Sequence, residues 1–210
     1  MAAVLSSPAL KSPMSTENLS AFIIAGFALI ASPGPATLGL AAAAAAFGVR
    51  RSLALMAGII AGVLVVFAMA AAGLTGLVLA QPVLGPVVKV LAALYMVYLA
   101  WSIATAPPIG QGDGSGAPTF LGGVFLGVGN PKAYAAMAAL ASGFVLAADR
   151  ATDAAAKTAI VLAIMIVADL AWLFAGSALA RAMRRPAYSR AINIAFALAL
   201  LASVAAGFLQ

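Results

Sequence analysis

The sequence contains no cysteine and no histidine. Without cysteine, the chain can form no disulfide, carry no thiol relay and offer no thiolate ligand to a metal. Without histidine, it lacks the side chain that most often serves as a general base or metal ligand near neutral pH. A Ser–His or paired-carboxylate catalytic centre is also missing. We therefore predict that the protein is not an enzyme and binds no cofactor and no metal.

Charged residues are also scarce. Asp, Glu, Lys and Arg make up 8% of the 210 residues, whereas 65% are hydrophobic. A soluble domain carries roughly 25% charged residues, because its surface faces water. The chain is therefore predicted to be an integral membrane protein whose surroundings are a lipid bilayer. The formal net charge of +6 lies in loop clusters rather than along one face, so we expect no binding to nucleic acid.

Six apolar runs are long enough to cross a hydrocarbon core of about 30 Å, which needs about 20 helical residues. We predict an all-α protein in which a single six-helix transmembrane domain occupies residues 19–209, after a short disordered leader at 1–18. The predicted spans are residues 19–47, 53–80, 87–106, 120–148, 159–180 and 191–209. The connectors between them are predicted at 49–52, 81–86, 107–119, 148–157 and 181–190.

The longest connector, 107–119, is rich in Gly, Pro and Ser and reads as a hinge between two halves, 19–106 and 120–209. Each half holds three spans. Because three is odd, the second half must lie in the membrane with the opposite orientation to the first, which predicts two inverted repeats. The first span of each half is near thirty residues long and is interrupted by proline at a corresponding depth. Such paired interruptions point to the binding site of inverted-repeat transporters.

The two interruptions read SPGP at 32–35 and NPK at 130–132. Proline is favoured at the first position of a helix, and Ser or Asn before it is a good N-cap. We therefore expect helices that restart at Pro33 and Pro131, capped by Ser32 and Asn130. A restarted helix directs free N–H groups at the membrane midplane, where they favour an anion such as a carboxylate. The alternative is that both prolines only kink packed helices.

Two stretches around these interruptions resemble a known family. SPGPATL at 32–38 and NPKAYAAMAAL at 130–140 are similar to the two signatures of the LysE/RhtB amino-acid exporters, and ADLAW at 168–172 resembles a third recurrent stretch. The resemblance implies export of amino acids or their derivatives across the bacterial inner membrane, driven by the proton gradient. The family often carries an Asp in the second span, whereas GIIAGVLVV at 58–66 is wholly apolar, which disfavours a cationic substrate. The candidate substrate-binding residues are Ser32, Pro33, Gly34, Pro35, Thr37, Asn130, Pro131 and Lys132.

Lys132 and Asp169 are the ionisable residues well inside predicted spans, and such residues are functional by default. We hypothesise that Lys132 pairs in turn with Asp169 and with the substrate carboxylate, so that Asp169 takes up a proton and couples transport to the gradient. The alternative is a purely structural ion pair. Gly58-x-x-x-Gly62 and Gly123-x-x-x-Gly127 predict close helix packing within the molecule rather than dimerisation.

Other functions and partners stay open from the sequence. Besides an amino-acid exporter, the chain fits a transporter or channel for another small solute or ion, or a non-transporting membrane assembly factor. The scarcity of carboxylates and the absence of His and Cys count against a metal ion as the solute. The expected partners are an amino acid, protons and the bilayer, and a homodimer is compatible with the sequence.

The loop charges predict the orientation in the membrane, because Lys and Arg near span ends favour the cytoplasmic side. The loops after the first, third and fifth spans hold Arg50, Arg51, Arg181, Arg184, Arg185 and Arg190. The opposite side holds Lys11, Lys89, Arg150 and Lys157. We expect the arginine-rich side to be cytoplasmic and both termini to lie outside. A reporter that is active only in the cytoplasm, fused after Gln210, should stay inactive, and an active fusion would reverse this assignment.

Overall fold

Helices make up almost all of the computed structural model, which describes residues 16–74, 83–105, 116–182 and 186–208. Within these ranges there are eight helices and no strand, so the predicted all-α class is confirmed. Their bounds are α1 Thr16–Ile30, α2 Pro35–Phe47, α3 Val49–Ala71, α5 Leu84–Thr105, α6 Phe120–Val128, α7 Pro131–Ser142, α8 Arg150–Ala182 and α9 Pro186–Phe208. The predicted leader lies outside the described residues up to position 15, and its last three residues belong to α1.

Both predicted helix breaks are present. Residues 31–34 separate α1 from α2, with a bend of 60° between the two helices. Residues 129–130 separate α6 from α7, which begins at Pro131 as predicted. The first restart, however, is at Pro35 with Gly34 as its N-cap, and not at Pro33. The residue before a proline avoids the helical region, and Gly34 is fully extended (φ −174°, ψ 178°), so a helix cannot run from Pro33 through Gly34.

The described helices give two or three candidate membrane spans by length and composition. These are α3, most of α8, and the bent pair α1–α2 if it is counted as one span. Several predicted boundaries were wrong: the expected connector at 49–52 is the first turn of α3, and most of the one at 148–157 is the start of α8. Gly48 alone makes the turn between α2 and α3, in a left-handed conformation (φ 84°) that glycine adopts without strain.

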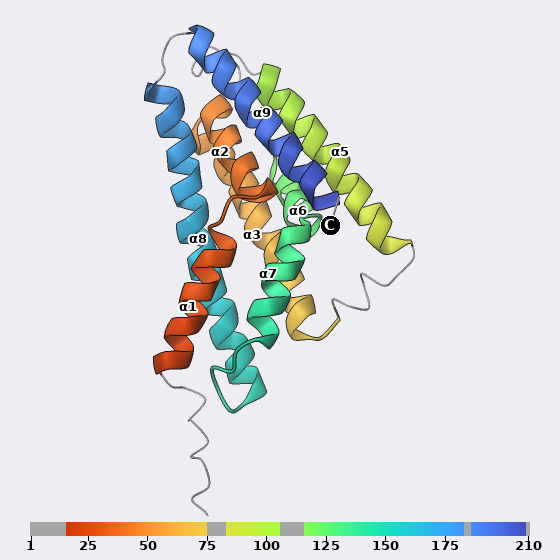
Figure 1. Cartoon of the computed structure of the whole chain (residues 1–210), viewed down its shortest axis with the longest axis vertical. Coiled ribbons are helices and arrows are strands. Elements are labelled where there is room, and N and C mark those ends of the chain that lie inside the picture. Colours follow the sequence, from red (N-terminus) through yellow and green to blue (C-terminus); the bar gives the residue numbers. More distant parts are fainter. Residues whose placement is uncertain (1–15, 75–82, 106–115, 183–185, 209–210) are drawn as a thin grey trace, which may run out of the picture.

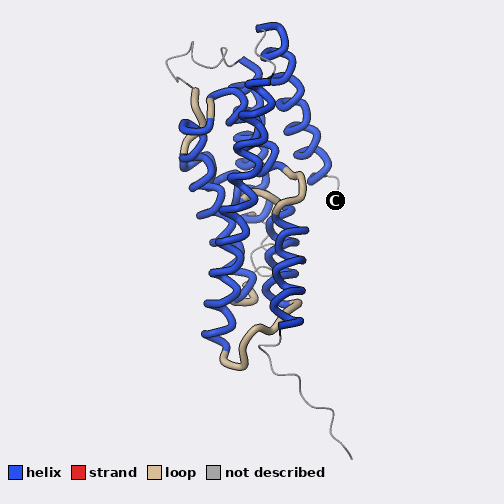
Figure 2. Tube along the Cα trace, turned by 90° about the vertical axis from the view of Figure 1, so that its left-hand side faces the viewer, coloured by secondary structure: helices blue, strands red, loops and turns tan. Residues whose placement is uncertain are grey.

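The helices of the two halves are interleaved. Figure 1 shows α5 and α9 side by side along one side of the molecule, with α1 and α8 on the other. Helix α3 packs against α6 and α7, while α8 packs against α2 and α1. Figure 2, turned by 90°, shows these helices running along the same long axis with loops gathered mainly at the ends. The two broken helices are therefore held next to each other in the middle of the molecule.

Small residues form the closest helix contact, between α3 and α6. A Cβ atom added to Gly62 would lie 2.6 Å from the carbonyl oxygen of Val124, and one added to Gly127 would lie 2.7 Å from that of Ile59. Both distances are too short for any carbon–oxygen contact, so only glycine permits this approach. The two G-x-x-x-G motifs therefore pack against each other within one chain, which confirms the predicted intramolecular role.

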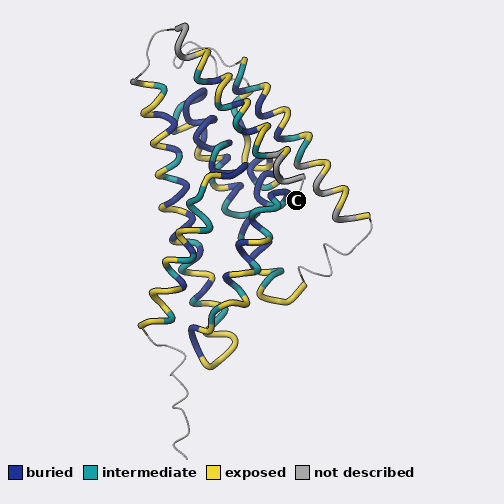
Figure 3. The backbone as a smooth tube through the Cα atoms, viewed as in Figure 1, coloured by how far each residue is buried: buried dark blue, intermediate teal, exposed yellow. Residues whose placement is uncertain are grey.

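The outer surface of the described helices is strongly apolar. Large side chains such as Trp101 (70% exposed) and Ile24 (69% exposed) point outward. The alanine run at 41–46, by contrast, is fully buried in the middle of the molecule. Figure 3 shows buried segments in the centre and exposed ones along the outer faces. An apolar exterior of this extent is what a lipid-facing surface requires, and it supports an integral membrane protein.

We predict that Gly62→Ala destabilises the protein by about 1–3 kcal/mol, because the added methyl group must push α6 away from α3. Thermal unfolding of the purified protein in detergent would measure the loss. Ala57→Leu is the matched control, since it adds more volume on the exposed side of the same helix. Equal unfolding temperatures for Gly62→Ala and the wild type would contradict the close packing.

Candidate functional site

A small cavity of about 40 Å³ lies where the two helix breaks meet α3 and α8. Its walls are mainly apolar, with Ile59 and Val63 from α3 and Met165 from α8 among them. Five of the predicted functional residues line it, namely Gly34, Thr37, Asn130, Lys132 and Asp169. The remaining four do not line it: Ser32 and Pro33 lie in the first break, and Pro35 and Pro131 are the first residues of α2 and α7.

The N-terminus of α2 is capped by Thr37 and not by the predicted cap, Ser32. The backbone N–H of Gly34 donates to the Thr37 hydroxyl oxygen at 2.9 Å, and this hydroxyl donates back to the Gly34 carbonyl at 3.1 Å. The Ser32 hydroxyl donates instead to the Leu29 carbonyl at 3.0 Å, so it closes the end of α1. Ser32 cannot cap α2 because it lies three residues before the first helical position.

The start of α7 has the predicted cap. The side-chain oxygen of Asn130 accepts a hydrogen bond from the backbone N–H of Lys132 at 3.1 Å, and Pro131 occupies the first helical position. Asn130 is buried, so this cap lies inside the molecule. Lys132 is consequently in the first turn of α7, where a positive charge is opposed by the helix dipole.

The side chain of Lys132 crosses from α7 to the break between α1 and α2. Its ammonium group donates a hydrogen bond to the backbone carbonyl of Ser32. Gly34 makes room for this crossing, because a Cβ atom there would lie 2.8 Å from Lys132 Cδ. The backbone of Gly34 is extended and accessible to any residue, so space for the lysine, and not backbone strain, is what requires glycine here.

The neighbouring carbonyl of the same break is bound by Trp172 of α8. Its indole N–H donates to the Ala31 carbonyl oxygen at 2.9 Å. The two successive carbonyls of the break thus each accept from a side chain of the other half, Ala31 from Trp172 and Ser32 from Lys132. The sequence had placed Trp172 only in the ADLAW stretch at 168–172, with no contact assigned to it. Its spacing three residues after Asp169, which places both on one face of α8, was the available signal.

Asp169 lines the cavity but does not pair with Lys132. Within the described part of the chain, the two side chains form no ion pair, and Asp169 Oδ2 has no hydrogen-bond partner. Only 3% of the Asp169 surface is exposed. Burying an ionised carboxylate with neither a donor nor a cation is very costly. The predicted resting ion pair is therefore absent from this structure, and its geometry favours a neutral, protonated Asp169.

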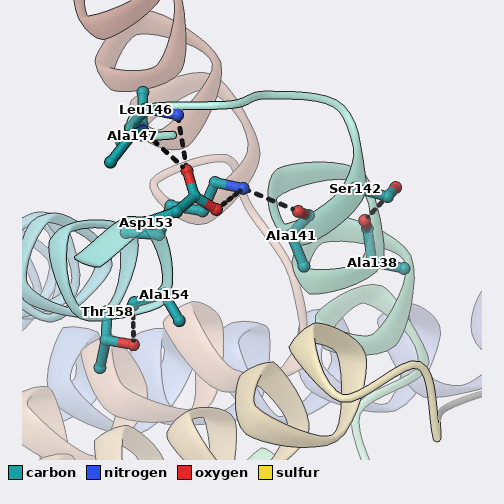
Figure 4. Close-up of polar contacts among 9 residues, drawn as sticks. Ala138, Ala141, Ser142, Leu146, Ala147, Asp153, Ala154 and Thr158 are labelled. Carbon is teal, nitrogen blue, oxygen red and sulfur yellow. Dashed lines mark hydrogen bonds and ion pairs between the residues drawn. The ribbon is translucent and has the colours of Figure 1, made fainter. Parts of the chain in front are cut away.

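A second polar cluster joins the end of α7 to the start of α8, in a region that the sequence interpretation assigned to a connector (Figure 4). Asp153 accepts from the backbone N–H groups of Leu146 at 2.6 Å and Ala147 at 3.2 Å, and its other oxygen forms an ion pair with Lys157 at 2.7 Å. Lys157 also donates to the Ala141 carbonyl at 3.0 Å. These contacts tie the helix carrying Lys132 to the one carrying Asp169.

The N-terminus of α8 is capped next to this cluster. The Asp149 carboxylate accepts from both the backbone N–H and the hydroxyl of Thr152, each at 2.8 Å. These hydrogen bonds, the backbone one foremost, hold the pKa of Asp149 below its usual value. The long helix α8 therefore begins at a well-defined point.

Comparison with known proteins identifies the family of the chain. The LysE type translocator family matches residues 27–210, so the chain belongs to this family of transporters. Similar relatives include the cysteine/O-acetylserine efflux proteins of Salmonella typhimurium (strain LT2), 30% identical, and Escherichia coli (strain K12), 29% identical. Each match spans 189 residues, 90% of this chain and 96% of the relative. No solved structure gives a significant match. Membership of a translocator family indicates a transporter rather than an enzyme.

We predict that Trp172→Phe destabilises the protein by about 1–2 kcal/mol, because it leaves the half-buried Ala31 carbonyl without its donor. The loss should appear as a lower unfolding temperature of the purified protein. Trp101→Phe is the matched control, since Trp101 is the other tryptophan and lies exposed on α5. If both variants unfold at the same temperature, the hydrogen bond to Ala31 does not hold the break.

Proposed function

We propose that the protein exports small amino acids or their derivatives from the cytoplasm across the bacterial inner membrane, in exchange for protons. The observation that carries this proposal is that one cavity brings together Lys132 from α7 and Asp169 from α8, beside both helix breaks. The family assignment supports transport, and the relatives named for cysteine and O-acetylserine efflux support this substrate class.

The substrate carboxylate is proposed to bind at Lys132. The Lys132 ammonium and the N-terminus of α7 both favour a negative charge at the same end of the cavity. Lysine at a helix N-terminus is unfavourable until an anion arrives, so carboxylate binding would relieve this repulsion. The cavity also suits a small substrate, because the described residues that line it are mainly aliphatic and methionine side chains and include no charged group besides Lys132 and Asp169 to bind a long polar side chain.

Transport requires the cavity to open alternately to each side. A volume of about 40 Å³ holds a few waters and is too small for an amino acid, so the site must widen to take up the substrate. We propose six spans in two inverted repeats, with α1–α2, α3 and α5 equivalent to α6–α7, α8 and α9. The packing supports this: α3 contacts α6 and α7 just as α8 contacts α2 and α1, and α5 contacts its counterpart α9. Rocking of these two groups would expose the site to either side.

Asp169 is proposed as the proton-coupling residue, together with Lys132. With the cavity empty, Asp169 carries a proton because Lys132 is bound to Ser32 and no other cation reaches it in the described residues. Substrate arriving from the cytoplasm brings a positive ammonium group, which favours the ionised carboxylate and releases the proton inward. Once the substrate has left on the outer side, Asp169 takes up a proton from there. One proton therefore moves in for each substrate that moves out.

The test is efflux of O-acetyl-L-serine and L-cysteine from proteoliposomes that contain the purified protein. The wild type should move both compounds out faster when the proton gradient is directed inward than when there is no gradient. Protein-free liposomes give the background rate. Transport of neither compound above this background would contradict the proposed substrate class.

We predict that Asp169→Asn lowers the rate of gradient-driven efflux at least tenfold, while substrate exchange across a membrane without a gradient continues. Asparagine keeps the shape of the side chain but cannot carry the coupling proton. Asp149→Asn is the control, because it replaces a carboxylate outside the cavity at a cap position that Asn also suits. An Asp169→Asn variant that still concentrates substrate against a gradient would show that this residue is structural.

A further inference from the structure

The Ser32 carbonyl oxygen already binds a primary ammonium group, that of Lys132. The carbonyl is available because the helix breaks at this point, and the extended Gly34 leaves space for the ammonium to approach it. An amino-acid substrate carries the same chemical group on its α-carbon. The carbonyl that accepts from Lys132 is therefore equally able to accept from a substrate.

The two carbonyls of the break are not equivalent in this respect. The Ala31 carbonyl accepts from the indole N–H of Trp172, a rigid side chain that does not line the cavity. Ser32 accepts from a flexible lysine that the proposed function also assigns to the substrate carboxylate. Lys132 must leave Ser32 when it turns to that carboxylate, and the vacated, half-buried Ser32 carbonyl then keeps only a long hydrogen bond from the Thr37 hydroxyl, at 3.5 Å. A second donor in place of Lys132 is therefore favoured.

A carboxylate is available in the cavity that Lys132 and Gly34 also line. Asp169 lines the same cavity, is 3% exposed, and its Oδ2 atom has no partner among the described residues. A primary ammonium has three N–H donors. It can therefore satisfy the carbonyl and the carboxylate together, which neither an amide nor a hydroxyl does with equal charge compensation.

We infer that on substrate binding the Ser32 carbonyl and the Asp169 carboxylate together form a subsite for the primary ammonium of the substrate, and that Lys132 occupies the carbonyl part of this subsite while the transporter is empty. The inference rests on the proposed export function, since it identifies which substrate group replaces the lysine. On substrate binding, Lys132 moves to the carboxylate, the α-ammonium takes its place on Ser32, and the Asp169 proton leaves. The charge balances, because a zwitterion arrives and one positive charge departs.

The first experiment measures the subsite without transport. In Lys132→Ala the tethered ammonium is gone, so a small free ammonium should bind in its place. We expect ethylammonium chloride to raise the unfolding temperature of this purified variant by about 3 °C or more over an equal concentration of tetramethylammonium chloride, which has no N–H donor. The wild type, whose lysine fills the subsite, should show no difference. Equal effects of the two salts on Lys132→Ala would overturn the subsite.

A further variant controls for binding elsewhere. Gly34→Leu combined with Lys132→Ala fills the space next to the Ser32 carbonyl with an apolar side chain. This double variant should lose the selective response to ethylammonium. If the response persists unchanged, the ammonium binds at another place and the inference is wrong.

The second experiment uses the wild-type protein and two isomeric probes. O-acetyl-L-serine has a free ammonium, whereas N-acetyl-L-serine has the same atoms and carboxylate but a neutral amide nitrogen. In a slightly acidic buffer, we expect proteoliposomes to release the O-acetyl isomer at least tenfold faster. Equal rates would overturn the ammonium subsite and leave export intact. If neither isomer is released, the proposed substrate class fails, and the unfolding measurement decides the subsite by itself.

Discussion

The structure of the site depends on a single constraint, the need to satisfy the backbone carbonyls that a broken helix frees inside a membrane. In lipid no water replaces the lost helical partners, so each carbonyl needs a donor from the protein. The break after α1 frees those of Ala31 and Ser32, and side chains of the other half, Trp172 and Lys132, bind them. The break therefore depends on the positions of α7 and α8 beside it. It depends equally on Gly34, which leaves space for the Lys132 side chain.

Close packing of glycines gives these contacts their precision. The Gly62–Gly127 approach sets α3 against α6, and the backbone atoms that touch Gly127 belong to Ile59 and Val63, which also line the cavity. A shift in this contact would therefore move one wall of the site. At the other end, the hydrogen bond from Lys157 of α8 to the Ala141 carbonyl of α7 joins these two helices. The polar groups of the cavity are thus positioned from two sides by contacts that take no part in binding.

The sequence predicted the helical class, both breaks and the Asn130 cap, because proline and its preceding residue act through local geometry. The first restart was misplaced by two residues since SPGP contains two prolines, and only the extended Gly34 shows which one starts the helix. The roles of Trp172 and Lys157 were not predictable, because their acceptors, the Ala31 and Ala141 carbonyls, are distant in sequence. The six-span inverted repeat stays a prediction that the exchanged helix pairings support.

Lys132 binds the Ser32 carbonyl and not the Asp169 carboxylate, and this has a consequence for the proposed coupling of substrate to protons. A resting Lys132–Asp169 ion pair would leave both charges satisfied, so neither a substrate nor a proton would have a strong reason to enter. In the observed arrangement the lysine keeps its charge with a neutral partner, and Asp169 has no partner at all in the described chain. The empty site therefore holds one unneutralised cation and one protonatable group. In the proposed mechanism a zwitterion satisfies both only by displacing the proton, so that occupancy by substrate and by proton would exclude each other, as antiport requires.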